Sequence, residues 1–163
     1  MPTIKEQAAD KLAQSKIIDR LSQFGKVYIT GSYALDLMVR KELDINVVTT
    51  KLAASGIIEI VSEVMKILDP ISLDYRNRTL SETKIRIDGH WLYVKCLDGW
   101  KFDIWLIDET ENAKQASEMA TFMKRLNTEN RKIILAIKEA VLEDPELSKT
   151  YSGQKVYEAV LDK

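Results

Sequence analysis

Three oxygen-bearing side chains lie inside otherwise apolar segments of the sequence. Asp44 and Asn46 belong to the segment 43–47, and Asp103 belongs to the segment 101–106. Residues two apart in a strand point to the same side, so Asp44 and Asn46 share one face, and a neighbouring strand would bring Asp103 beside them. Carboxylate and carboxamide oxygens are ligands that Mg²⁺ or Mn²⁺ accepts, and such ions support phosphoryl transfer. We therefore expect a metal site at Asp44, Asn46 and Asp103.

A glycine and a serine follow a short apolar segment, 26–30, that has the pattern of a strand. Eleven residues separate this pair, Gly31 and Ser32, from Asp44. Glycine lets a phosphate approach the backbone closely, and serine adds a hydroxyl donor. Because a Gly-Ser pair occurs in many turns, only its combination with the two acids indicates a phosphate site.

Together these residues resemble the signature of the nucleotidyltransferase superfamily, the DNA polymerase beta-like fold. Its pattern is an apolar residue, Gly, then Gly or Ser, a spacer of about nine to thirteen residues, then Asp, apolar, Asp or Glu, apolar. Gly31, Ser32 and Asp44 fall on this pattern, Asp103 matches a third acidic position, and Asn46 departs from it. The resemblance covers roughly the first two thirds of the chain, which is similar to small stand-alone bacterial members of the superfamily.

The resemblance implies an enzyme that uses a nucleoside triphosphate with Mg²⁺ or Mn²⁺. Gly31 and Ser32 would bind the nucleotide, and Asp44 and Asp103 would be catalytic, with Asn46 as a further metal ligand. The reaction would transfer a nucleoside monophosphate to a hydroxyl of a small-molecule or protein acceptor. In some members of the superfamily a carboxylate also deprotonates the acceptor, and Asp103 is the candidate here.

Two alternatives remain open at this stage. Asn46 carries no charge where the superfamily has a second acid, so the chain could be a weakened or inactive nucleotide-binding or metal-binding protein of the same fold. Alternatively, the acids could be structural, with Asp44 paired to Arg40 or Lys41 and Asp103 paired to Lys101 or Lys95. Such surface ion pairs would have little energetic value.

The hydrophobic pattern predicts the elements that must position these residues. Apolar residues at helical spacing predict helices over about 4–24, 34–39, 53–68, 111–143 with a break near 127–128, and 156–161. A further short helix or turn is expected to open at Asp144-Pro145. Alternating or continuous apolar runs predict strands over about 26–30, 43–49, 85–87, 91–94 and 100–107. Asp-Gly pairs at 88–89 and 98–99 predict two tight hairpin turns, and hence an antiparallel meander of three strands.

We therefore expect an α/β fold (α+β by some conventions). A small mixed β-sheet with an antiparallel meander would carry Asp44 and Asp103, helices would pack on one face, and a C-terminal helical segment would complete the core. The 163 residues are an ordinary size for one domain. We expect a single nucleotidyltransferase-like domain over 1–163, with a core of about 1–110 and a helical segment of about 111–163.

Composition narrows the range of partners and locations. The formal net charge of −1 and the pI near 5.9 argue against broad binding of a polynucleotide backbone, so a nucleotide and another hydroxyl acceptor are the expected partners. Cys96 is the only cysteine, which excludes an intramolecular disulfide and fits a reducing compartment. No segment approaches the roughly 18 apolar residues of a membrane span, and the expected location is the cytoplasm.

Several side chains near the predicted hairpins have a second interpretation. His90, the only histidine, is expected to be an ordinary turn residue near a loop tip. Trp105 would share the face of Asp103, where it either stacks on a base or covers the sheet. A basic cluster either holds a triphosphate or lies on a solvated strand edge, and it consists of Arg76, Arg78, Lys84 and Arg86.

Overall fold

The computed structural model describes residues 1–79 and 87–161. Its strands are β1 (Lys26–Thr30), β2 (Glu42–Val48), β3 (Ser72–Asn77), β4 (His90–Lys95) and β5 (Lys101–Ile107). Its helices are α1 (Ile4–Ser15), α2 (Ile17–Leu21), α3 (Gly31–Leu35), α4 (Ala54–Leu68), α5 (Glu109–Arg125), α6 (Thr128–Glu143), α7 (Pro145–Thr150) and α8 (Gly153–Leu161). Within these described ranges, no helix has the length and apolar character needed to cross a bilayer.

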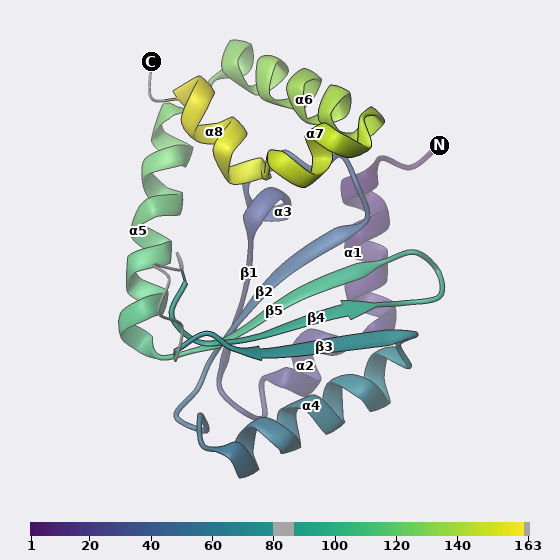
Figure 1. The fold of residues 1–163 in the computed structure, drawn as a ribbon, viewed down its shortest axis with the longest axis vertical. Coiled ribbons are helices and arrows are strands. Elements are labelled where there is room, and N and C mark those ends of the chain that lie inside the picture. The colour runs from purple at the N-terminus through teal and green to yellow at the C-terminus, as the bar shows by residue number, and fades with distance from the viewer. Residues whose placement is uncertain (80–86, 162–163) are drawn as a thin grey trace.

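The strands form one five-stranded mixed sheet in the order β1-β2-β5-β4-β3 (Figure 1). The central strands β2 and β5 run parallel, and every other neighbouring pair is antiparallel. A parallel pair requires a crossover, and here the chain leaves β2 for α4, β3 and β4 before it returns to β5. The sheet therefore confirms the predicted mixed α/β architecture, and it brings two distant segments together at its centre.

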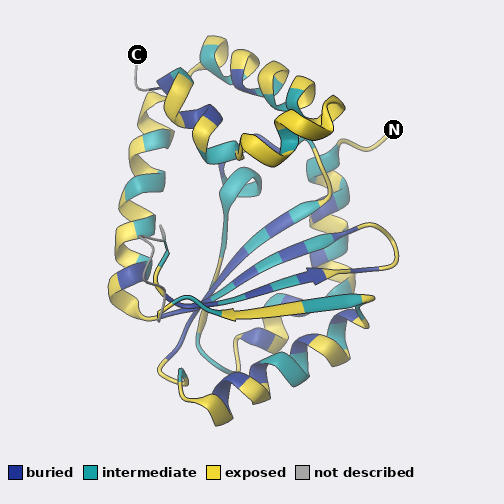
Figure 2. Ribbon diagram, viewed as in Figure 1, coloured by how far each residue is buried: buried dark blue, intermediate teal, exposed yellow. Residues whose placement is uncertain are grey.

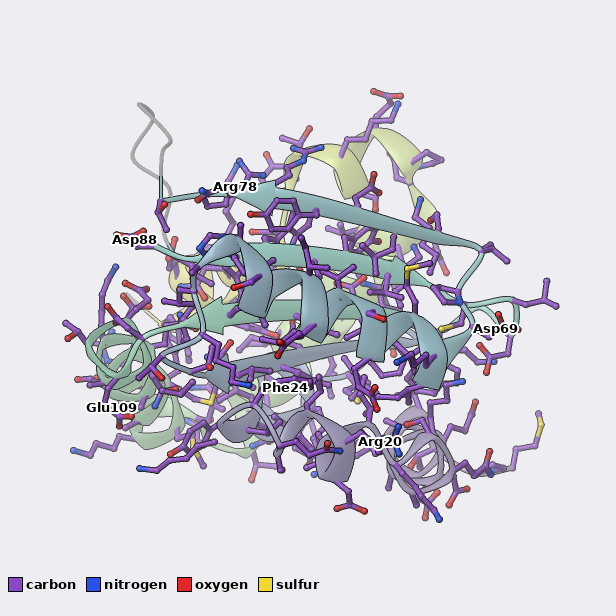
Figure 3. All side chains as sticks on the ribbon, turned by 90° about the horizontal axis from the view of Figure 1, so that it is seen from below. Arg20, Phe24, Asp69, Arg78, Asp88 and Glu109 are labelled. Atoms are coloured by element: carbon purple, nitrogen blue, oxygen red, sulfur yellow. The ribbon has the colours of Figure 1, made fainter. Side chains whose placement is uncertain are left out.

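One face of this sheet packs against α1, α2 and α4 (Figures 1 and 3). Alternate residues of the two central strands supply the buried side chains of that face, and each is fully or almost fully inaccessible to solvent (Figure 2): Leu43, Ile45, Val47, Phe102, Ile104 and Leu106. A period of two along each strand means that the residues between them must point to the other side. These three helices lie on one face, as predicted, and the residues that could do chemistry lie on the other.

The C-terminal helices form an apolar cluster of their own. Leu35 and Leu37, in and just after α3, pack with Ile134 of α6 and with side chains of α8. The break between α5 and α6 was predicted, and it lies where the Asn127 side chain accepts hydrogen bonds from the first backbone N–H groups of α6. This segment therefore builds a second core over α3 and does not extend the one beneath the sheet.

Two local predictions need correction near the N-terminus. The helix predicted over 4–24 is interrupted at Lys16, whose φ of 54° lies in the left-handed region and closes α1 through a hydrogen bond from its N–H to the Leu12 carbonyl. The helix expected from residue 34 begins instead at Gly31, directly after β1. The sharp junction places Gly31 and Ser32 at the edge of the sheet rather than in an extended loop.

The antiparallel meander is present, but its first strand differs from the prediction. β4 pairs with β3, whereas the predicted strand 85–87 lies partly outside the described residues and Ile87 forms a bend. Gly89 does not adopt a positive φ; a Cβ there would lie 2.6 Å from the Leu106 carbonyl oxygen, so glycine permits close approach to β5. The hairpin at Asp98-Gly99 is confirmed, with Gly99 at φ 84°.

Candidate functional site

Asp44 and Asp103 lie directly opposite each other on the parallel strands β2 and β5. Thr30, the last residue of β1, is the partner of Asp44 on the other side. Because Leu43, Ile45 and their counterparts on β5 face the helices, both aspartates point to the open face of the sheet. The structure therefore brings these two predicted residues together, from segments almost sixty residues apart in the chain.

A third carboxylate, missed by the sequence prediction, completes the group. Oxygen atoms of Glu42, Asp44 and Asp103 lie within 4.8 Å of one another. The sequence prediction treated Glu42 as part of a polar connection, but it is the first residue of β2 and shares the face of Asp44. Two signals could have identified Glu42. It lies two residues before Asp44, and nine residues separate it from Ser32, so Glu42-Leu43-Asp44-Ile45 also fits the acidic pattern, with Glu in place of the first Asp.

Gly31 touches the carboxylate group directly. Its φ is 59°, and a Cβ added there would lie 2.0 Å from Oδ2 of Asp44. A side chain at this position would therefore suffer both backbone strain and a steric clash. Ser32 lines the same pocket as the carboxylates, so the predicted Gly-Ser pair and the two predicted aspartates form one site.

Asn46 lies at the margin of this site, and its side-chain amide is hydrogen-bonded to Gln115. It is 1% exposed, and its Nδ2 donates a hydrogen bond to Oε1 of Gln115 on α5 at 3.0 Å. Gln115 in turn donates from Nε2 to Oε1 of Glu111 at 3.4 Å. The side-chain amide of Asn46 therefore links β2 to α5, a role that the sequence did not suggest.

The close carboxylates perturb one another. Burial raises the pKa of Asp44 to about 7, and the neighbouring charges of Asp103 and Glu42 act in the same direction. Burial also raises the pKa of Asp103 to about 6, although a hydrogen bond from the Trp91 indole opposes that shift. Gathering like charges in a partly buried place is unfavourable unless a cation or proton compensates them. The group is therefore electrostatically suited to a bound cation.

The structural alternative required both aspartates to form surface ion pairs. Arg40 forms its ion pair with Glu42, at 2.8 Å, and not with Asp44. Asp103 accepts a hydrogen bond from Trp91. Among the ion pairs found within 1–79 and 87–161, none involves Asp44 or Asp103. These observations do not support the structural alternative for either acid.

The carboxylates open into a pocket of about 300 Å³ between the sheet and the C-terminal helices. Gly31 and Ser32 lie at its edge, α5 contributes Gln115, and Tyr157 of α8 contributes to the opposite wall. Part of this lining is apolar and comes from α5, α6 and the segment 151–157, including Met119, Phe122, Val141, Leu142, Tyr151 and Val156.

Lys138 of α6 provides a positive charge in that lining. Its Nζ donates hydrogen bonds to the Leu37 carbonyl at 2.5 Å and to the Tyr157 hydroxyl at 3.0 Å. Burial, followed by the charge of Arg40, lowers the pKa of Lys138 to about 8, while Asp44 opposes this shift. The pocket thus combines a carboxylate floor with a half-buried amine from α6, which sequence reasoning did not identify.

His90 requires a correction, because it does not lie at a loop tip. It is the first residue of β4 and is 6% exposed, and its Nδ1 lies 2.9 Å from the Tyr75 hydroxyl. Burial lowers the pKa of His90. Its register partner on β5 is Leu106, a core residue, so His90 lies on the opposite face from the carboxylates and takes no part in the site.

The remaining predicted residues fall on the site's margin. Trp105 lines the pocket beside Asp103. Arg76 and Arg78 lie over the ring of Trp91, with guanidinium carbons 5.3 and 5.4 Å from its centroid. The other two members of the predicted basic cluster, Lys84 and Arg86, lie outside the described residues.

Comparison with known proteins supports the fold at the level of structure only. Neither the family models nor the curated sequences searched match the chain. Terminal uridylyl transferase 4 from Trypanosoma brucei, solved with bound UTP and UMP, is similar with a TM-score of 0.57 and 15% identity, over 95% of this chain and 49% of that one.

Two further solved structures agree with this match. A cytoplasmic RNA terminal U-transferase gives a TM-score of 0.54 at 13% identity, over 85% of this chain and 38% of its own. Cid1 in complex with its short product ApU gives a TM-score of 0.53 at 11% identity, over 85% of this chain and 40% of its own. The chain thus spans less than half the length of these proteins. The mixed five-stranded sheet and these matches confirm the predicted nucleotidyltransferase-like fold, which the chain shares with these terminal transferases.

Proposed function

We propose that the protein is a nucleotidyltransferase, which transfers a nucleoside monophosphate from a nucleoside triphosphate to a hydroxyl of a small molecule or a protein. One observation carries this proposal. Three carboxylates from two adjacent parallel strands meet within 4.8 Å, beside a glycine that touches one of them, at the floor of a pocket. That arrangement supplies oxygen ligands next to a place where a phosphate can approach the backbone.

The donor set fits Mg²⁺ or Mn²⁺. Glu42, Asp44 and Asp103 offer hard oxygen ligands, and their mutual repulsion would be relieved by a divalent cation. When bound, such an ion would neutralise phosphate charge and polarise the phosphorus that is attacked. In this assignment Glu42 supplies the carboxylate that Asn46 lacks, and Asn46 supports the site through Gln115.

The chain's own residues supply the other roles. Gly31 and Ser32 bind the triphosphate, and Lys138 faces it from α6. Asp103 accepts the proton of the acceptor hydroxyl. The hydroxyl oxygen bonds to the α-phosphorus, the bond from that phosphorus to the bridging oxygen breaks, and pyrophosphate leaves. Burial keeps the pKa of Asp103 near 6, which suits a group that takes up a proton near neutral pH.

The C-terminal helices are the proposed site of acceptor recognition. Their contribution to the pocket is partly apolar and includes Val141, Leu142 and Tyr151. One solved neighbour is described as an RNA terminal U-transferase, but a net charge of −1 argues against affinity from broad neutralisation of a polynucleotide backbone. We therefore assign a small-molecule or protein acceptor in preference to a polynucleotide.

The pocket also supports treating residues 1–163 as one functional unit. Its lining combines the strand residues Asp44 and Asp103 with Lys138 and Tyr157 from the C-terminal helices. The single cysteine, Cys96, is a buried free thiol. On that ground we place the protein in the cytoplasm.

A second candidate function is nucleotide or metal binding without turnover. Its motivating observation is Asn46, whose amide is turned to Gln115 and brings no charge to the site. The two functions share the same pocket and differ only in whether the phosphoryl group is transferred.

Calorimetry and a pyrophosphate assay test the proposal in sequence. Each common nucleoside triphosphate is first titrated into the protein with Mn²⁺, using Asp44→Asn as the matched variant. Pyrophosphate release is then followed with a panel of small alcohols and hydroxyl-bearing proteins. Binding and release that both require Asp44 support the transferase. Binding without release from any acceptor favours the second candidate, and an absence of binding to the wild-type protein contradicts both.

A further inference from the structure

One oxygen of Asp103 is held from outside the pocket. The indole Nε1 of Trp91 donates a hydrogen bond to Oδ1 of Asp103 at 2.5 Å. In the β4-β5 pairing Trp91 lies opposite Trp105, and Asp103 lies opposite Tyr93, so this bond runs diagonally between the strands. An indole N–H can only donate, and a carboxylate is the strong acceptor that it meets here.

The ring of Trp91 is itself fixed by its neighbours. It stacks on Tyr93, with centroids 5.6 Å apart and planes at 18°, and meets Trp105 at 6.3 Å and 40°. The guanidinium groups of Arg76 and Arg78 lie within 5.5 Å of its centroid. Stacking and cation–π contacts of this kind restrict the rotation of the ring. The N–H therefore points in one direction before any ligand arrives.

Trp91 contacts Asp103 but does not line the pocket itself. The described lining of the pocket includes Asp103 and Trp105 but stops short of Trp91. Trp91 therefore reaches the cation group only through Asp103. The indole thus holds Oδ1 of Asp103, while a carboxylate oxygen of Asp103 lies within 4.8 Å of oxygens of Glu42 and Asp44.

We propose that Trp91 is a positioning residue, which holds the carboxylate of Asp103 in the orientation that the divalent cation requires and so sets the affinity of the carboxylate group for Mg²⁺ or Mn²⁺. The inference rests on the proposed function for the presence of a cation. Its physical basis is that hydrogen bonds to metal ligands restrict the ligand and commonly change metal affinity by about 10-fold to 100-fold.

The test uses the whole chain and two tryptophan substitutions. Trp91→Phe keeps most of the ring and removes the N–H. Trp100→Phe is the matched control, since Trp100 is buried beside the Asp98-Gly99 turn and contacts Lys41 rather than the acids. Mn²⁺ affinity is measured by calorimetry without nucleotide. The indole N–H resonances of the wild-type protein are assigned by triple-resonance NMR and followed as Mg²⁺ is added.

We expect Trp91→Phe to bind Mn²⁺ about 10-fold to 100-fold more weakly than the wild type, with Trp100→Phe unchanged. The Trp91 indole resonance should move on Mg²⁺ addition and also in Asp103→Asn without metal, while that of Trp100 stays in place. Unchanged Mn²⁺ affinity in a folded Trp91→Phe overturns the proposal. If that variant does not fold, a Trp91 resonance indifferent to both Mg²⁺ and Asp103→Asn overturns it.

The two ideas can fail separately. If the wild-type protein binds no Mn²⁺ with or without nucleotide, the proposed function fails, and the positioning role falls with it. If the wild type binds Mn²⁺ but Trp91→Phe binds it equally well, the positioning role fails alone and the proposed function stands.

Discussion

On β2, Leu43 and Ile45 are fully buried against the helices, while Glu42 and Asp44, which alternate with them, face the pocket. The same contrast recurs on β5, where Phe102 and Ile104 flank Asp103 along the strand. The buried side chains remove apolar surface from water, which stabilises the fold. The carboxylates repel one another and are partly desolvated, which opposes folding.

The comparison shows how this sheet reconciles stability with chemistry. The two faces use the same backbone, so the packing of one face fixes the positions of side chains on the other. The register between β2 and β5 is enough to bring Asp44 opposite Asp103, and side-chain contacts such as that of Trp91 then orient the carboxylates. Substitutions one residue apart in sequence should therefore have opposite consequences.

The largest effect is expected from Asp44→Asn. Removal of this central carboxylate should weaken Mn²⁺ binding by about 100-fold or more, because one ligand and one negative charge are lost. The free energy of unfolding of the metal-free protein should stay constant or rise at pH 8, since repulsion among the carboxylates is relieved. Calorimetry and urea denaturation measure the two quantities.

Asp74→Asn is the control for this prediction. Asp74 lies on β3 and is exposed. Its substitution should leave both quantities unchanged. A loss of several kcal/mol of stability in Asp44→Asn would mean that the carboxylate face contributes to folding, and the contrast between the faces would be wrong.

The apolar face is probed by Phe102→Ala. Phe102 is fully buried, and truncation in a core of this kind costs about 3–5 kcal/mol through lost burial and a residual cavity. Mn²⁺ affinity of the folded protein should change much less than in Asp44→Asn. Thermal denaturation gives the first quantity, and calorimetry well below the melting temperature gives the second. Phe102→Leu should cost less, and an equal cost for the two substitutions would argue against cavity formation.

Gly31→Ala tests a residue on which both the stability of the fold and the geometry of the carboxylate group depend. The left-handed backbone disfavours alanine by about 1–2 kcal/mol, and the added Cβ would also collide with Asp44. Both stability and Mn²⁺ affinity should therefore fall. Gly99→Ala is a matched control, because Gly99 also has a positive φ but nothing lies within 4 Å of an added Cβ. Equal Mn²⁺ affinities in the two variants would contradict the direct contact.

The pH dependence gives a smaller but diagnostic effect. Burial and mutual repulsion raise the pKa of Asp44 to about 7 and that of Asp103 to about 6, above their values in the unfolded chain. Between pH 4 and about pH 7 the folded metal-free protein therefore holds more protons at these groups than the unfolded chain, and their contribution to stability decreases as pH rises. Mn²⁺ requires ionised ligands, so its affinity should increase with pH.

Two measurements test this pH dependence of stability and Mn²⁺ affinity. Mn²⁺ affinity should rise by up to about tenfold per pH unit between pH 5 and pH 7, for each proton displaced. In metal-free urea titrations, the difference in unfolding free energy between the wild type and Asp44→Asn should shift in favour of the variant over the same interval. A difference that does not depend on pH would show that the Asp44 carboxyl is unperturbed.

The sequence predicted the part of the site that depends on strand alternation. Asp44 and Asp103 lie among apolar residues, and a period of two is enough to place them on the face away from the core. The hairpin turn at Asp98-Gly99 and the break between α5 and α6 followed from equally local patterns. The parallel register of β2 and β5 could not follow from such patterns, because segments almost sixty residues apart are joined by tertiary pairing.

The residues missed by the sequence prediction depend on tertiary contacts. Glu42 was assigned to a polar connection, and its spacing from Ser32 and Asp44 gains meaning only because β2 begins at Glu42 and pairs with β5. Lys138 lies on an amphipathic helix, where a lysine is unremarkable until α6 is seen to close the pocket. His90 was placed at a turn because Asp88-Gly89 resembled a hairpin, whereas the glycine serves close packing against β5. In each case the neighbouring element decided the role.

Asn46→Asp is expected to have the smallest effect. It tests whether β2 binds the cation through Glu42 and Asp44 or through Asp44 and Asn46. If Glu42, Asp44 and Asp103 form the cation site, adding an acid at Asn46 should not increase Mn²⁺ affinity. It should instead remove the N–H donor to Gln115 and cost about 1 kcal/mol of stability. Calorimetry and urea denaturation measure both effects.

Gln115→Ala removes the same hydrogen bond without adding charge, and the comparison decides between two explanations. Similar losses of stability in the two variants, with Mn²⁺ affinity unchanged, would mean that Asn46 serves to join β2 to α5. A tenfold or greater gain of Mn²⁺ affinity in Asn46→Asp alone would mean that this position faces the cation. In that case the metal ligands on β2 would be Asp44 and Asn46 instead of Glu42 and Asp44. The natural site would then be a weakened one, because Asn46 carries no charge.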